Sequence, residues 1–276
     1  MRSSTILLAG FTSFLTASVA PDRGSPSAPF DTSGAASLFA TNVSSRAEKP
    51  TIVLVHGAWA DATGWQELIP LLQRRGYTVV AVENPLTSYT DDVATTKRLI
   101  DAQNGPVIAV GHSYGGAVIT GAAAGNPNVK ALVYVAAFAP DAGEPIGALQ
   151  GKYPATPLAT ALKPDAAGFL YIDTNKFRDA FAQDVPLREA RIMAATQKPL
   201  NGSALGASPA QAAWRTIPSW YLVATEDHAL SPALERFYAK RMGAHVTEVR
   251  SSHVMFISHA NEVAKAIEEA ANTEVK

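Results

Sequence analysis

A serine between two glycines is the first feature of this sequence that can do chemistry. Residues 106–116 read PVIAVGHSYGG, an apolar, strand-like run that leads into a turn and then into small residues. Gly-x-Ser-x-Gly between a strand and a helix is typical of a nucleophile elbow, which exposes the serine hydroxyl. Gly111 and Gly115 lack the β-carbons that would collide across such a turn. The pattern therefore predicts Ser113 as a nucleophile, with the N–H groups of the next helix aimed at the same point.

A serine hydroxyl is a poor nucleophile near neutral pH and needs a neighbouring base. His253 follows the last expected strand, within the sequence SSHV at 251–254. A triad histidine lies on the loop just after a strand, so His253 is the predicted base and His259, at an expected helix start, is the alternative. His56 and His112 occupy motif positions where the backbone is expected to matter more than the ring.

The base needs a carboxylate that orients its ring and stabilises the imidazolium. Glu226 and Asp227 both follow an expected strand that ends at Ala224, and their spacing alone does not separate them. Two backbone N–H groups should also bind the oxyanion that forms during acyl transfer. The predicted donors are Tyr114, directly after the nucleophile, and Ala58, in the loop after the first strand.

The composition excludes several functional classes. The 276 residues are 47% hydrophobic with a net charge of −1, which suits one large domain and provides no basic patch for nucleic acid. The chain has no cysteine, so disulfides, thiol nucleophiles and thiolate metal sites are excluded. The predicted chemistry needs no metal and no organic cofactor. Neither a stable membrane span nor a nucleic-acid partner is expected, and the oligomeric state is left open, a homodimer included.

The first 49 residues differ from the rest. Residues 1–20 contain one basic residue, Arg2, and then an apolar run that is too short to span a membrane, which fits a secretory signal peptide and predicts export. A cytoplasmic location is the alternative, because the basic region is a single arginine and Pro21 follows the best cleavage site. Residues 21–49 are rich in Pro, Ser, Ala and Gly and are expected to form a flexible linker.

From residue 50, strand-like and helix-like runs alternate. This rhythm predicts an α/β fold with a mostly parallel, doubly wound sheet of about six strands and its chemistry at their carboxyl ends. The expected core covers 50–139 and 215–276. Strands are expected at 51–55, 77–82, 107–110, 129–138, 219–224 and 246–249. Helices are expected at 65–75, 91–102, 114–124, 232–242 and 259–271, the last with Ser258 as N-cap.

The rhythm stops over residues 140–214, which contain several Pro and Gly. We interpret this segment as a cap inserted over the active site, with a short strand-like piece at 168–172 and helices at 176–183 and 186–196. A cap of this kind shapes an apolar substrate pocket. The candidate lining residues are aromatic: Trp59, Tyr114, Phe138, Tyr171 and Trp214.

With these residues identified, the chain resembles the α/β-hydrolase superfamily. It is similar in particular to the group that contains plant methyl esterases, hydroxynitrile lyases and bacterial carboxylesterases. The resemblance runs from about residue 50 to the C-terminus and rests on LVHGAW (54–59), GHSYGG (111–116), VAAFAPD (135–141), ATEDHALSP (224–232) and SSHVMF (251–256). The chain order of nucleophile, acid and base is also that of α/β-hydrolases. In this group the Asp of the Thr-Glu-Asp stretch is the triad acid, so the resemblance implies Asp227 rather than Glu226.

These observations predict a serine hydrolase that cleaves carboxylic esters through an acyl-enzyme. The resemblance keeps a hydroxynitrile-lyase-like lyase and a cofactor-free oxygenase as alternatives, and the fold alone also allows a non-catalytic ligand-binding protein. The hydroxynitrile lyases that this chain resembles have Thr at the position of Gly57 and Lys directly after the histidine, where Val254 stands here. The resemblance therefore implies hydrolysis.

Overall fold

A parallel six-stranded sheet organises the protein. The computed structural model describes residues 49–275, so the predicted signal peptide at 1–20 and all but Lys49 of the predicted linker at 21–49 lie outside the described residues. The strand order is β2-β1-β3-β4-β8-β9, and every neighbouring pair is parallel. The strands are β1 (Thr51–Val55), β2 (Val79–Val82), β3 (Val107–His112), β4 (Val129–Val135), β8 (Ser219–Ala224) and β9 (His245–Val249). This is the predicted α/β-hydrolase fold class.

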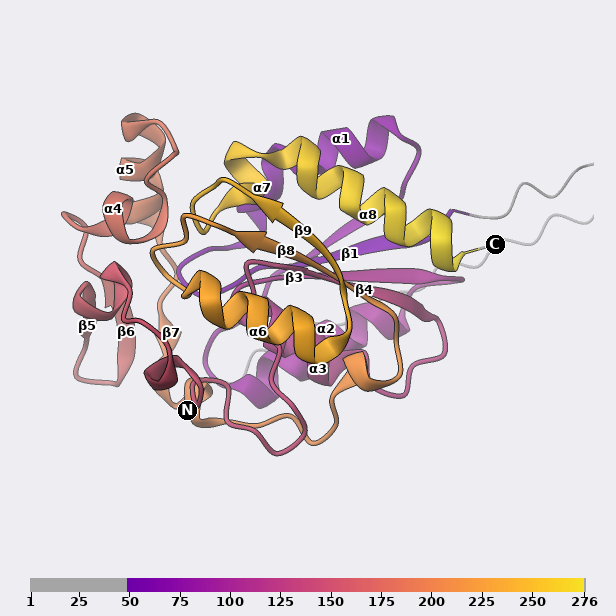
Figure 1. Ribbon diagram of the computed structural model, residues 1–276, viewed down its shortest axis with the longest axis horizontal. Coiled ribbons are helices and arrows are strands. Elements are labelled where there is room, and N and C mark those ends of the chain that lie inside the picture. The colour runs from indigo at the N-terminus through magenta and orange to yellow at the C-terminus, as the bar shows by residue number, and fades with distance from the viewer. Residues whose placement is uncertain (1–48, 276) are drawn as a thin grey trace, which may run out of the picture. The chain divides into compact units, whose positions relative to one another are not determined.

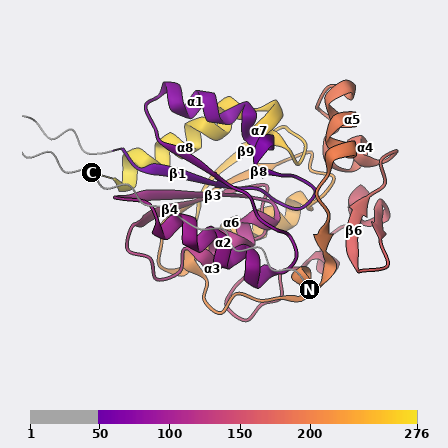
Figure 2. The ribbon, with the colours of Figure 1, turned by 180° about the vertical axis from the view of Figure 1, so that it is seen from behind.

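The central strands are apolar on both faces because helices cover the sheet on both sides. Every residue of β3 is buried, and β1 pairs with it in the register Val53 to Ala109. In Figures 1 and 2, α1 (Leu68–Arg74) and α8 (Ala260–Glu274) lie on one face of the sheet. On the other face lie α2 (Tyr89–Asp101), α3 (Tyr114–Ala122) and α6 (Pro232–Met242).

Two helices have ends that local residue types explain. The Ser88 side chain accepts a hydrogen bond from the N–H of Asp91 at 3.1 Å and caps α2. Gly243 ends α6 with φ of 64°, a left-handed conformation that glycine adopts without a β-carbon clash.

Several expected boundaries were wrong. The single helix expected at 65–75 is a 3-10 turn, η1 (Ala62–Gln66), followed by α1, and β4 ends three residues early because Ala136 has a positive φ of 44°. Ser258 does not cap the last helix. It is the last residue of an additional short helix, α7 (Met255–Ser258), and α8 begins at Ala260.

The segment interpreted as a cap has secondary structure of its own, at one end of the main sheet (Figure 1). Three short antiparallel strands, β5 (Leu162–Pro164), β6 (Phe169–Ile172) and β7 (Leu200–Asn201), form a second sheet. The helices α4 (Phe177–Phe181) and α5 (Leu187–Thr196) lie beside each other. The 3-10 turns η2 (Gln150–Lys152), η3 (Pro157–Thr160), η4 (Gly202–Gly206) and η5 (Ala213–Arg215) complete it.

Trp59 ties this segment to the core. Its backbone N–H donates to the Lys198 carbonyl at 3.0 Å, and its indole N–H donates to the Leu170 carbonyl in β6 at 2.7 Å. No helix among residues 49–275 is both long and apolar enough to cross a membrane.

Candidate active site

Ser113 lies on a strained turn between β3 and α3. Its φ and ψ are 53° and −124°, a conformation that non-glycine residues rarely adopt and that is found mainly at functional sites. Two glycines make the turn sterically feasible. A β-carbon on Gly111 would lie 2.6 Å from the Gly115 carbonyl oxygen, and one on Gly115 would overlap the Val55 carbonyl oxygen. The glycines therefore allow β1, β3 and α3 to approach closely enough to present the serine.

Asp227 and His253 form a buried, hydrogen-bonded pair. His253 Nδ1 donates to Asp227 Oδ2 at 2.5 Å, and neither side chain is more than 1% exposed. The other carboxylate oxygen accepts from the N–H groups of Ala229 at 2.6 Å and Leu230 at 2.9 Å. With Nδ1 as the donor, Nε2 is the free acceptor, and it has no hydrogen-bond partner among the described residues.

The rings of His56 and His112, at positions where the backbone was expected to matter more, also make hydrogen bonds. His112 Nε2 donates to the backbone carbonyl of His253 at 3.0 Å, and the two rings lie 4.7 Å apart. Burial holds the pKa of His112 well below its usual value, so its ring is uncharged. The His56 ring donates to the Gly57 carbonyl at 2.8 Å and accepts from the Asn84 N–H at 3.0 Å.

An acidic residue of the cap segment holds the loop that carries His253. Asp184 lies between α4 and α5, and its Oδ2 accepts from the backbone N–H of Ser252 at 2.9 Å. The same oxygen accepts from the Ser258 hydroxyl at 2.8 Å. The position of His253 therefore depends on the cap segment as well as on the core.

The two residues predicted to bind the oxyanion are found at the same cavity. Ala58 and Tyr114 line the same cavity as Ser113 and His253. Tyr114 is the first residue of α3, where backbone N–H groups have no acceptor within the helix. Its hydroxyl donates to the buried carboxylate of Asp92 at 2.7 Å, which fixes the side chain beneath the turn.

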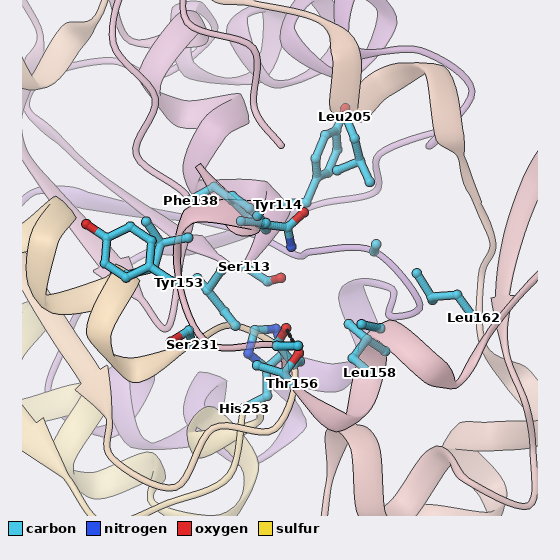
Figure 3. Close-up of a pocket in the computed structure, with 18 of the residues that line it drawn as sticks. Ser113, Tyr114, Phe138, Tyr153, Thr156, Leu158, Leu162, Leu205, Ser231 and His253 are labelled. Carbon is cyan, nitrogen blue, oxygen red and sulfur yellow. Dashed lines mark hydrogen bonds between the residues drawn. The ribbon is translucent and has the colours of Figure 1, made fainter. Parts of the chain in front are cut away.

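A cavity of about 420 Å³ opens above Ser113 and is mostly apolar. Figure 3 shows the Ser113 hydroxyl and the His253 ring at its floor, with side chains of the cap segment around them. Of the aromatic residues expected to line it, Trp59 and Phe138 do so in addition to Tyr114.

Tyr171 and Trp214 do not line this cavity, contrary to expectation. Tyr171, in β6, is 38% exposed. Trp214 is buried elsewhere, where its indole N–H donates to the Pro140 carbonyl at 2.9 Å and Arg241 lies over its ring. Aromatic character alone did not reveal on which side of the cap segment each ring packs.

None of the cap residues that face the cavity was predicted from the sequence. They come from short turns, a three-residue strand and irregular stretches, which have no hydrophobic period to detect. The main ones are Tyr153, Thr156, Leu158, Leu162 and Leu205. From the core side, Leu230, Ser231 and Leu234 join them just after the Asp227 turn.

The two rejected candidates lie outside the cavity lining. Glu226 is half-exposed and pairs with Arg250 at 2.6 Å, while His259 Nδ1 lies 2.9 Å from the Ser258 hydroxyl. Within residues 49–275, no group of three His, Asp or Glu side chains is placed to hold a metal ion. Ser113, His253 and Asp227 are the groups that the fold brings together, and they can support nucleophilic attack with proton transfer.

Comparison with known proteins identifies the family. Residues 52–266 match the alpha/beta hydrolase family. The chain belongs to this family. It is 27% identical over 256 residues to the pyrethroid hydrolase of Sphingobium wenxiniae, an alignment that covers 80% of this chain and 87% of the relative. It is also 37% identical over 107 residues to an alpha-hydroxynitrile lyase of Arabidopsis thaliana, covering 34% of this chain and 42% of the lyase.

Solved structures agree on the fold. The crystal structure of polyneuridine aldehyde esterase superposes with a TM-score of 0.70 at 19% identity, and the match covers 80% of this chain and 99% of the esterase. The relatives thus include proteins named as hydrolases and esterases and one named as a lyase, so membership alone does not fix the reaction.

Proposed function

We propose that the protein is a serine hydrolase that cleaves carboxylic esters through an acyl-enzyme. The observation that carries this proposal is the Asp227–His253 pair: His253 lines the same cavity as Ser113, and its Nε2 has no hydrogen-bond partner among residues 49–275. That arrangement provides a base with the correct tautomer beside a serine on a strained turn.

Ser113 Oγ attacks the ester carbonyl carbon while His253 Nε2 accepts its proton. This transfer needs the hydroxyl and Nε2 to come within hydrogen-bonding distance when substrate binds, as is common for sites that are looser without ligand. The carbonyl oxygen becomes an oxyanion that accepts from the N–H groups of Ala58 and Tyr114. One such donor contributes about 3 kcal/mol to the transition state.

His253 then protonates the departing alcohol, and the acyl group remains on Ser113. A water molecule enters, gives its proton to Nε2 and attacks the acyl carbon. Collapse of the second oxyanion releases the acid and restores the Ser113 hydroxyl. Asp227 remains ionised throughout and orients the imidazole.

The cavity favours esters with a bulky apolar group. Its volume of about 420 Å³ and its leucine-rich walls suit an apolar acyl or alcohol part, while Thr156 and Ser231 provide the few polar contacts. The pyrethroid hydrolase relative is consistent with such substrates.

The test is Ser113→Ala against the wild type. Turnover of p-nitrophenyl esters of increasing chain length, of lactones and of aromatic methyl esters should fall nearly to the uncatalysed rate in the variant, with unchanged thermal unfolding. A fluorophosphonate should label wild-type Ser113 covalently. Substantial ester turnover by folded Ser113→Ala would disprove the proposal, and so would wild-type protein that neither turns over esters nor takes the label.

The similarity to a hydroxynitrile lyase makes cyanohydrin cleavage the specific alternative reaction. A lyase of this scaffold would release cyanide from a cyanohydrin without forming an acyl-enzyme. At the position after His253, however, this chain has Val254, which is fully buried and uncharged, so no cation is present there to stabilise departing cyanide. Measuring cyanide release from mandelonitrile distinguishes the two reactions.

A further inference from the structure

A second buried carboxyl lies at the end of β8 and has no role in the mechanism above. Glu235, in the first turn of α6, is fully buried. Its Oε2 accepts from the backbone N–H of Ala224, the last residue of β8, at 3.0 Å. Its Oε1 is buried without a hydrogen-bond donor anywhere in residues 49–275. A glutamate is almost never fully buried unless it is paired, so this group needs a partner.

The Asp227 turn is bound to the same strand end as Glu235: the N–H of Ala224 donates to Glu235, and the carbonyl of Ala224 accepts from the Asp227 N–H at 3.3 Å. Asp227 already accepts from two backbone N–H groups and from His253. Two carboxylates in contact, both removed from water, repel each other strongly unless one of them is protonated.

The nearby Arg236 and Tyr221 side chains do not compensate two negative charges here, because each of them binds another group. Arg236, the next residue of α6, points outward and binds Glu248 on β9 at 2.7 and 2.8 Å. Tyr221 on β8 donates its hydroxyl to the Ala137 carbonyl. Burial, and then the charge of Asp227, raise the pKa of Glu235 well above its usual value.

On the basis of the proposed function, we propose that Glu235 is a positioning residue that stays protonated at neutral pH and donates a hydrogen bond to the Asp227 carboxylate. The proton remains on Glu235 through the reaction, so the pair carries one negative charge. Asp227 then receives four hydrogen bonds, from Ala229, Leu230, His253 and Glu235. These bonds hold the Asp227 carboxylate in the position that orients the imidazole, and they lower the basicity of that carboxylate. The proton between Asp227 and His253 therefore stays on His253 Nδ1.

Two substitutions separate this role from simple space filling. Glu235→Gln keeps a neutral donor toward Asp227 and an acceptor toward the Ala224 N–H, so kcat/KM should stay within about twofold and the acidic limb of its pH profile should not move. Glu235→Met keeps a similar volume but donates nothing. Because hydrogen bonds to charged groups are strong, kcat/KM should fall by about tenfold. The acidic limb should move to higher pH, because an Asp227 carboxylate with fewer hydrogen bonds stabilises the imidazolium more strongly.

An ionised Glu235 would give a different result. Glu235→Gln would then remove a negative charge near His253 and shift the acidic limb to lower pH. That shift would overturn the proposal. Equal profiles for Glu235→Gln and Glu235→Met would also overturn it, because they would show that the side chain only fills space.

Infrared spectroscopy tests the proton without any turnover. The wild-type minus Glu235→Gln difference spectrum at neutral pH should contain the carbonyl stretch of a protonated carboxylic acid. The matched control is Glu248→Gln, which removes an exposed, ion-paired carboxylate on β9 and should show carboxylate bands only. Absence of the acid band in the first spectrum would refute the proposal even if Glu235→Met does not fold. Wild-type protein that shows the band but hydrolyses no ester would refute the proposed function and not the proton.

Discussion

Asp227→Asn tests the hydrogen bonds at the centre of the site. The asparagine oxygen can still accept from the N–H groups of Ala229 and Leu230, which bind one carboxylate oxygen in the wild type. The amide NH₂ then takes the place of Oδ2 and faces His253 Nδ1 at about the present 2.5 Å. Two donors cannot face each other, so the His253 ring must move its proton to Nε2. In that tautomer Nε2 no longer accepts the proton of Ser113.

The expected loss in kcat is about 10⁴-fold, the magnitude for a triad whose histidine is held in the wrong tautomer. At about 1.36 kcal/mol per factor of ten, this corresponds to about 5.4 kcal/mol of transition-state stabilisation. Folding should suffer less. The hydrogen bond between residues 227 and 253 reverses its direction and loses the carboxylate charge, and a hydrogen bond to a charged group contributes about 1.5–3 kcal/mol.

The assay is steady-state and burst-phase hydrolysis of a p-nitrophenyl ester that the wild type turns over, alongside thermal unfolding of each variant. The matched control is Glu226→Gln, one residue earlier, where a half-exposed carboxylate pairs, among residues 49–275, with Arg250 alone. Its rate should stay within about twofold of the wild type, because surface ion pairs contribute little. A folded Asp227→Asn protein that loses less than tenfold in kcat, or a Glu226→Gln protein that loses more than Asp227→Asn, would refute the assignment of Asp227.

Three further predictions follow from single contacts. Gly115→Ala should destabilise the fold by about 1–3 kcal/mol in urea unfolding, because its methyl group would overlap the Val55 carbonyl oxygen; an unchanged midpoint would contradict this close approach. Asp184→Ala should lower kcat several-fold by freeing the Ser252 N–H, while Asp184→Asn keeps an acceptor and should stay close to the wild type; equal rates for both variants would contradict the link between cap segment and His253 loop. Glu235→Gln should change how stability depends on pH. The folded protein keeps a proton on Glu235 that the unfolded chain releases near its ordinary pKa of 4.5, so wild-type stability is fully present below that pH and falls above it. Above pH 4.5, the free energy of unfolding of the variant relative to the wild type should rise by about 1.4 kcal/mol per pH unit, as measured by chemical unfolding. Parallel curves for the two proteins would show that Glu235 is ionised in the fold.

The sequence predicted the parts of the protein that repeat a period or need a special backbone. The strand at Ser219–Ala224 and the helix at Pro232–Met242 have the expected bounds, because continuous apolar runs and a Pro-to-Gly helix signature define them locally. The Ser113 turn was predictable because only glycines allow three backbone segments to meet there. The expected cap at Ser258 failed because α7 takes up that residue before α8 begins, and no local pattern marks the break.

The residues that support the site could not be predicted, because they are acidic residues in the first turns of helices. Asp92 and Glu235 both occupy positions where an acidic residue ordinarily faces water and interacts with the helix dipole. In the structure both are fully buried. Asp92 accepts from the hydroxyl of Tyr114, and Glu235 accepts from the N–H of Ala224, three residues before Asp227. Asp92 therefore supports Tyr114, and Glu235 supports Asp227. In each case the contact depends on how a helix packs on another segment, which no periodicity in the sequence encodes. The predicted nucleophile, base and acid can be found from motifs. The residues that hold them can be found only once the helices are packed on the sheet, and in this protein that second group includes the carboxyl that decides how basic Asp227 is.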